Sequence, residues 1–103
     1  MIYIHEHKFI YFLEKREPVF SNCPNNITVS TNPGVATKSV TWTVPTATDY
    51  KGMRVTVTVK PTAYVPPVKL RIGVRMIEYT ATDDESRIAY CRFSVKVKGS
   101  FLK

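Results

Sequence analysis

The sequence predicts an all-β sandwich of about six or seven strands in a single domain. Short runs alternate apolar with polar residues, turn residues separate these runs, and no stretch shows helical periodicity. A chain of 103 residues has the size of one domain. Two layers are expected because a sheet with one apolar face needs a second sheet to cover it.

The clearest element is a β-hairpin within residues 72–97. The apolar face of its two runs carries Ile77, Tyr79 and Ala81, then Ala89, Cys91, Phe93, Val95 and Val97. Side chains alternate along a strand, so each run is typical of a half-buried strand. Residues 83–87 supply turn chemistry between the runs. A turn centred on Glu85 places Glu78 opposite Arg92 and predicts a modest cross-strand ion pair.

Three shorter strands are expected before this hairpin. Residues 27–29 begin the first, which ends at the turn dipeptide Pro33–Gly34. Residues 40–44 alternate and form the second, which stops at Pro45. Within the second strand, Trp42 is the expected core aromatic between the sheets.

The chain then alternates again over residues 53–60 and stops at Pro61, which predicts the third of these strands. Residues 46–52, between the second and third strands, are predicted to form a polar turn. Three prolines within 61–67 predict a loop or an edge strand that lacks donors. After Gly73 the inward-facing apolar residues move to odd-numbered positions, which indicates a bulge or a tight corner at this glycine.

Two cysteines, Cys23 and Cys91, lie near opposite ends of the predicted domain, 68 residues apart. This spacing excludes a CxxC redox or zinc pair. In a strand-rich extracellular domain we expect a disulfide between the first and last strands, unlike the bridge buried midway in antibody domains. In the loop-entropy model, closing such a loop lowers the conformational entropy of the unfolded chain, which raises the free energy of unfolding by about 4 kcal/mol. A pair of free buried thiols is the other interpretation.

Residues 1–17 are expected to lie outside the domain as a leader or extension, with the domain at 18–100 and a tail at 101–103. The first segment does not match a secretory signal, because charged residues interrupt it and it has no small residue for cleavage. We expect a fragment of a longer secreted protein whose signal peptide is not in this chain; an unusual extension is the alternative. No apolar run reaches eighteen residues, so no membrane insertion is expected.

The order of short motifs resembles the hyalin repeat, or HYR domain, over residues 18–98. The motifs are Cys23–Pro24, NITV at 26–29, Pro33–Gly34, VTW at 40–42, PTATD at 45–49, IEYTATD at 77–83 and CRFSV at 91–95. The resemblance implies an immunoglobulin-like sandwich from extracellular proteins, where such domains occur in tandem or beside sushi modules. It also implies a role in cell adhesion and matrix contacts.

Cys23 and Cys91 fall on cysteine positions of the family, so the resemblance supports the disulfide. One turn departs from the family pattern of Asp, two residues and Gly–Asn. Residues 83–87 read DDESR and contain no glycine, so the hairpin tip is expected to be longer or built on another turn.

The predicted function is a non-enzymatic extracellular interaction module that contacts an extracellular protein or matrix component. The net charge of +7 favours acidic partners, although solubility alone also accounts for it. The alternative functions are binding of a polyanion such as heparan sulfate, and a purely structural spacer. The candidate polyanion-binding residues are Lys69, Arg71, Arg92, Lys96 and Lys98; a solvated sheet face is the competing interpretation. We expect no nucleic-acid partner.

Two further kinds of site have both a functional and a structural interpretation. The tetrapeptide TATD occurs at 46–49 and 80–83, where Asp49 and Asp83 either bind calcium, with Asp84 and Glu85, or accept backbone hydrogen bonds in Asx turns. The irregular acidic spacing favours the turns. Asn26 opens an Asn-Ile-Thr sequon and is a candidate glycosylation site.

Catalysis and cofactor binding have little support in the sequence. The only histidines are His5 and His7, both in the leading segment, so no Ser-His-Asp arrangement can form inside the domain. A zinc site from these histidines and the two cysteines lacks the usual ligand spacing. We therefore expect no catalytic residue, no metal and no cofactor.

Overall fold

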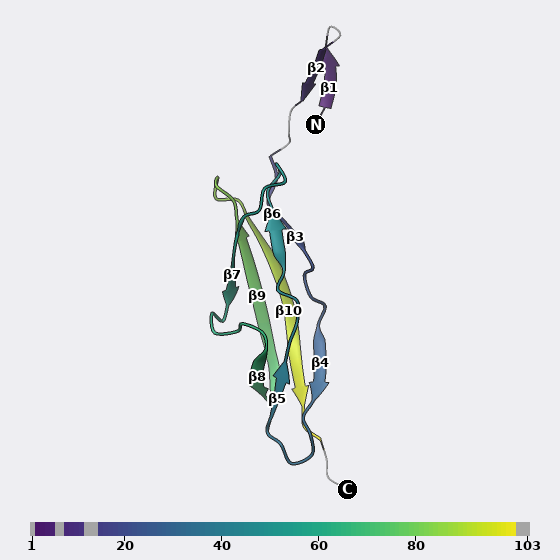
Figure 1. Cartoon of the computed structure of the whole chain (residues 1–103), viewed down its shortest axis with the longest axis vertical. Helices are drawn as coiled ribbons and strands as arrows, with labels where there is room; N and C mark the ends of the chain where they lie inside the picture. The colour runs from purple at the N-terminus through teal and green to yellow at the C-terminus, as the bar shows by residue number, and fades with distance from the viewer. Residues whose placement is uncertain (1, 6–7, 12–14, 101–103) are drawn as a thin grey trace.

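The computed structural model describes residues 2–5, 8–11 and 15–100, and every regular element within these ranges is a β-strand (Figure 1). Strands β1 (Ile2–His5) and β2 (Lys8–Tyr11) pair with each other antiparallel. The other eight strands are β3 (Val19–Ser21), β4 (Ile27–Ser30), β5 (Thr37–Val40), β6 (Thr46–Thr48), β7 (Thr56–Lys60), β8 (Val68–Arg71), β9 (Gly73–Thr82) and β10 (Ile88–Lys98). His7 and the predicted tail 101–103 lie outside the described residues.

The eight strands β3–β10 form the predicted sandwich. One layer is a four-stranded sheet in the order β4-β10-β9-β7, in which β4 runs parallel to β10 and the other pairs are antiparallel. The second layer consists of the antiparallel pairs β3-β6 and β5-β8, which lie over that sheet in Figure 1. Within the described residues no helix occurs, and so none has the length and hydropathy needed to cross a membrane.

The core lies between the two layers. From the four-stranded sheet it takes Ile77, Tyr79, Cys91, Phe93, Val95 and Val97, and from the second layer Val40 and Leu70. Alternate residues of β9 and β10 are buried, as the sequence pattern predicts. Phe93, with 1% of its surface exposed, is the central aromatic residue. Trp42 is only partly buried, but it packs edge-on against Phe93 with ring centroids 5.6 Å apart.

The predicted hairpin is correct to the residue. Glu78 pairs with Arg92, and their side chains form an ion pair with 2.6 Å between Oε2 and Nε. Residues 83–87 connect the two strands, as predicted. The long alternation explains this success, because a register shift of one residue would turn the whole apolar face of β10 outward.

The boundaries of the shorter strands differ from those predicted. The second predicted strand, 40–44, is instead β5 at 37–40, and residues 41–45 connect it to β6. β6 lies in the segment predicted to be a turn, and β3 was not predicted at all. These two three-residue strands pair with each other, with Phe20 opposite Ala47. With β8, which was also not placed from the sequence, they bring the number of strands in the sandwich to eight. Pairing between distant segments, not a local pattern, defines β3 and β6.

One covalent bond and one unusual backbone conformation connect parts of the two layers. The Cys23–Cys91 disulfide is present, with Cα atoms 5.8 Å apart. Cys91 is buried in β10, whereas Cys23 is exposed in the segment between β3 and β4 rather than inside a strand. Gly73 has φ of 145° at the point where the chain leaves the β5-β8 pair and joins the four-stranded sheet. The predicted tight corner is therefore where the chain changes layer.

Candidate functional site

One end of the sandwich carries two turns of the same construction, at residues 49–53 and 83–87. Asp49 Oδ1 accepts hydrogen bonds from the backbone N–H groups of Lys51 and Met53, both at 2.9 Å. Asp83 Oδ1 accepts from the second and fourth residues that follow it, at 2.9 and 2.8 Å. The Asx-turn interpretation of the TATD repeat is confirmed at both aspartates.

The backbone of the two turns is also equivalent. The N–H of each aspartate donates to the carbonyl four residues later, and the carbonyl of each aspartate accepts from the N–H three residues later. The fourth residue has positive φ in both turns: 81° at Gly52 and 65° at Ser86. Ser86 therefore holds the left-handed position that usually favours glycine. The tip at residues 83–87 therefore has the same turn as residues 49–53, with serine in the place of glycine. The expectation of a longer or different turn at the tip is wrong.

These bonds bear on the calcium interpretation of Asp49, Asp83, Asp84 and Glu85. One oxygen of Asp49 and one of Asp83 already accept two backbone N–H groups each. Within the described part of the chain, no three histidine, cysteine, aspartate or glutamate side chains are grouped as a metal site requires. The acidic side chains of the turns have structural partners instead.

The Asp83 carboxylate is buried and pairs with Arg87. Arg87 Nε lies 2.9 Å from Asp83 Oδ2. The same side-chain Nε–H donates a hydrogen bond to the carbonyl oxygen of Arg16 at 3.2 Å. Burial by itself raises the pKa of Asp83, but the backbone N–H groups of Arg87 and Glu85 and the Arg87 charge together hold that pKa below its ordinary value. Asp83 thus stays ionised and holds the turn in place.

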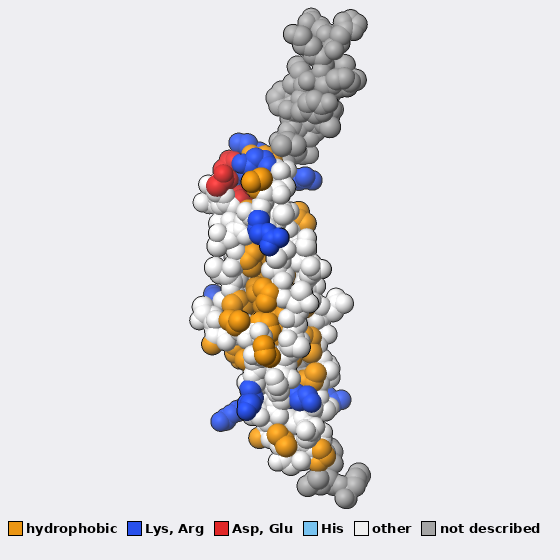
Figure 2. Space-filling view, viewed as in Figure 1, with side chains coloured by type: hydrophobic (Ala, Val, Ile, Leu, Met, Phe, Trp, Pro, Cys, Tyr) orange, Lys and Arg blue, Asp and Glu red, His pale blue; other side chains and the backbone are white. Residues whose placement is uncertain are grey.

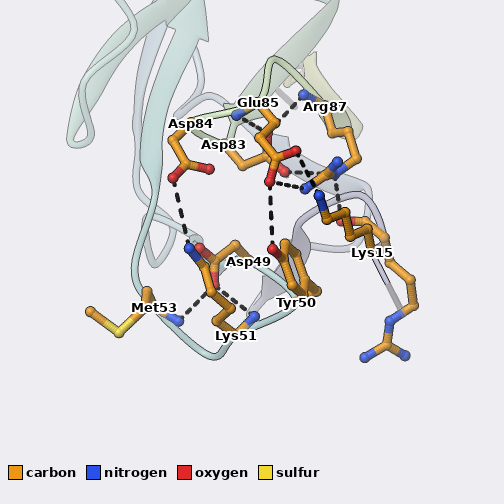
Figure 3. A network of polar contacts seen from close by, with 10 residues as sticks. Lys15, Asp49, Tyr50, Lys51, Met53, Asp83, Asp84, Glu85 and Arg87 are labelled. Carbon is orange, nitrogen blue, oxygen red and sulfur yellow. Dashed lines mark hydrogen bonds and ion pairs between the residues drawn. The ribbon is translucent and has the colours of Figure 1, made fainter. Parts of the chain in front are cut away.

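Glu85 joins three segments at this end of the molecule (Figure 3). Its carboxylate accepts from Arg87 Nη2 at 3.3 Å and from Lys15 Nζ at 3.3 Å. These hydrogen bonds, that of Arg87 first, hold the pKa of Glu85 below its ordinary value. The Tyr50 hydroxyl lies 3.5 Å from the same carboxylate. The hairpin tip is thereby tied both to the other turn and to the chain that enters the domain.

A shallow open cleft of about 410 Å³ lies between the two turns. Lys51 Nζ, on one turn, is 3.7 Å from Asp84 Oδ2 on the other. The Arg87 guanidinium lies 5.1 Å from the Tyr50 ring centroid, a cation–π distance. The cleft is lined by residues of both signs, Lys51, Arg54, Asp49, Asp83 and Asp84 among them. Sequence analysis did not predict this cleft, although the repeated TATD motif was the signal for two equivalent turns.

The five predicted polyanion-binding residues do not form one stripe. Lys69 and Arg71 point outward from β8 in the second layer, on either side of buried Leu70. Arg92, Lys96 and Lys98 are exposed on the outer face of β10 in the four-stranded sheet. The candidate residues therefore cover two outer faces, and Arg92 is neutralised by Glu78.

Asn26 lies just before β4 and its side chain is exposed. Its Oδ1 accepts a hydrogen bond from the backbone N–H of Ser94 at 2.9 Å, which fixes the amide against β10. The Nδ2 atom, which would carry a glycan, is on the other side of the amide from this bond. Thr28, the third residue of the sequon, is exposed on β4.

Fold and surface together define a small, disulfide-tied β-sandwich module of immunoglobulin-like architecture, with polar turns at one end. The family model for the HYR domain matches residues 14–97, so the chain belongs to the HYR family. The family resemblance seen in the motifs is thus confirmed. No solved structure matches the chain.

Two curated relatives are similar to the chain. They are the mouse and rat proteins named "Sushi, von Willebrand factor type A, EGF and pentraxin domain-containing protein 1". Each is 45% identical over 76 residues, which is 74% of this chain. The chain spans 2% of the length of these relatives, which are multi-domain proteins by name.

Proposed function

We propose that the chain is a non-enzymatic interaction module of a larger extracellular protein, where it makes adhesion or matrix contacts. Membership of the HYR family and similarity to part of a multi-domain relative support this proposal. The disulfide supports an oxidising compartment, because such bonds persist mainly in secreted and extracellular proteins.

The observation that carries the proposal is that the chain enters and leaves the sandwich at opposite ends. Lys15 and Arg16 contact Glu85 and Arg87 at the end with the two turns. The last strand ends at Lys98, whose carbonyl accepts from the N–H of Thr31 at the other end (Figure 1). Neighbouring modules therefore attach in line, and both outer sheet faces stay open to partners.

The test is binding of the purified, oxidised chain to cultured cells and to deposited matrix. The reduced and alkylated chain is the matched control, because it has the same composition and charge without the disulfide. Saturable binding by the oxidised chain alone supports the proposal. Equal binding by both forms, or none by either, contradicts it, and the second result favours a structural spacer.

A further inference from the structure

The charge of the sandwich is unevenly distributed along its length. Around the two turns, five acidic and five basic side chains balance: Glu17, Asp49, Asp83, Asp84 and Glu85 against Lys15, Arg16, Lys51, Arg54 and Arg87. The opposite end carries only basic side chains among the described residues. This basic end consists of Lys38, Lys69, Arg71, Arg75, Lys96 and Lys98. On the face in Figure 2, acidic side chains appear only near the turns.

Strand register explains why residues from distant segments meet there. On β10, Lys96 and Lys98 point outward while Val95 and Val97 are buried, and Lys96 pairs with Val74 near the start of β9. The chain changes layer at residues 72–73, so the end of β8 lies beside the start of β9. The outward residues of β8 therefore lie at the same end of the sandwich as those of β10.

Arg75 connects the basic residues of the two layers. Its Nη1 donates to the carbonyl oxygen of Arg71 at 2.6 Å, which holds the guanidinium beside the last residue of β8. Lys38 on β5 lies opposite Leu70, between the partners of Lys69 and Arg71. Directly opposed residues of an antiparallel pair share a face, so Lys38, opposite buried Leu70, and Arg75, opposite buried Val95, lie on the inner faces of their layers. Lys69, Arg71, Lys96 and Lys98 lie on the outer faces, so the six cations occupy both outer faces and the edge between them at one end of the sandwich.

Arg92 does not belong to this group. It lies in the middle of the four-stranded sheet, opposite Glu78, and the 2.6 Å ion pair cancels its charge. The exposed Lys96 and Lys98 have no acidic residue opposite them on β9 or β4. At the basic end, an approaching anion therefore meets positive charge with no acidic side chain of the described residues opposite it.

We propose that the basic end binds a sulfated polysaccharide chain that lies across the edges of both layers. A linear polymer with closely spaced sulfates fits cations that curve around an end, because each sulfate meets a separate lysine or arginine. Binding would release the counterions condensed on the polymer, so the affinity would fall steeply with salt. The choice of a sulfated polysaccharide over nucleic acid rests on the extracellular location in the proposed function.

The test measures affinity for heparin oligosaccharides at about 0.15 M salt, where the Debye length is about 8 Å. The basic-end variant K69Q/R71Q/K96Q/K98Q loses four charges, and the control R16Q/K51Q/R54Q/K60Q loses the same number elsewhere. We expect a loss of about tenfold or more for the first and less than about threefold for the second. R92Q is expected to bind like the parent chain.

Three results would overturn the proposal. They are equal weakening by both four-residue variants, unchanged affinity for fully desulfated heparin, and tighter binding of single-stranded DNA than of heparin. The variant K69R/K96R/K98R keeps the charge and is expected to bind like the parent chain, which separates charge loss from misfolding. Matrix binding that survives heparinase while heparin binding fails would refute this site and leave the proposed function standing.

Discussion

Replacing Ser86 with glycine is expected to raise the free energy of unfolding by about 0.5–1 kcal/mol. Ser86 has φ of 65°, a left-handed conformation that costs an L-residue about 1–2 kcal/mol. Glycine removes this cost, but it loses about 0.5–1 kcal/mol more chain entropy on folding. The difference is the expected gain, because none of the hydrogen bonds found in this turn uses the Ser86 side chain.

The equivalent turn supplies the reverse experiment. Gly52 has φ of 81°, and a Cβ built there meets no heavy atom within 4 Å. The cost of Gly52→Ser is therefore conformational rather than steric, and we expect a loss of about 0.5–1 kcal/mol. Ser94→Gly, within β10, is the matched control, and glycine in a strand interior should destabilise by a similar amount.

Urea unfolding at neutral pH, followed by tryptophan fluorescence, measures all three variants. The transition midpoint should rise for Ser86→Gly and fall for the other two, with an unchanged m-value. A neutral or destabilising effect of Ser86→Gly, or a stabilising effect of Gly52→Ser, would show that the two turns are not equivalent.

Three further predictions follow from the disulfide, the buried carboxylate and the sequon. The double variant Cys23→Ala/Cys91→Ala should lose about 4 kcal/mol of unfolding free energy in equilibrium urea titrations, and a loss below about 1 kcal/mol would refute the loop-entropy argument. The fold lowers the pKa of Asp83 below its ordinary value of 3.8. The ionised carboxylate therefore contributes its full share of the unfolding free energy above pH 3.8, and this share is lost as the pH falls through the lowered pKa. The urea midpoint should therefore decline in acid, and Asp83→Asn should flatten that decline; an equally steep profile in the variant would contradict it. Expression through the secretory pathway should attach one glycan at Asn26, seen as a mass shift that peptide N-glycosidase removes and Asn26→Gln abolishes; an unshifted parent chain would contradict this.

The parts of the fold that the sequence predicted are those with a long alternating pattern. In β9 and β10 the buried set, from Ile77 to Val97, fixed both the strands and their register. Strands β3 and β6 have three residues each, too few to show a period, and only their mutual pairing defines them. Pro45 lies outside any strand, as predicted, but the strand before it ends earlier than predicted, at Val40.

The sequence predicted surface features that depend on hydrogen bonds between neighbouring residues. It did not predict features that depend on how distant segments are arranged in the fold. The Asx turns at Asp49 and Asp83 need only the next four residues, so the TATD motif predicts them. The grouping of cations does not follow from local pattern. Lys69 and Lys96 share one end of the sandwich only because the chain changes layer at Gly73, and Arg75 was not among the predicted residues.

The Cys23–Cys91 disulfide ties an early loop to the last strand of the sandwich, and the fold described above depends on it. Peptide mapping of the secreted chain, digested without reduction and after alkylation of free thiols, tests it most directly. We expect a single cross-linked pair of peptides that contains Cys23 and Cys91, with neither cysteine alkylated. Recovery of both cysteines as alkylated, unlinked peptides would contradict it.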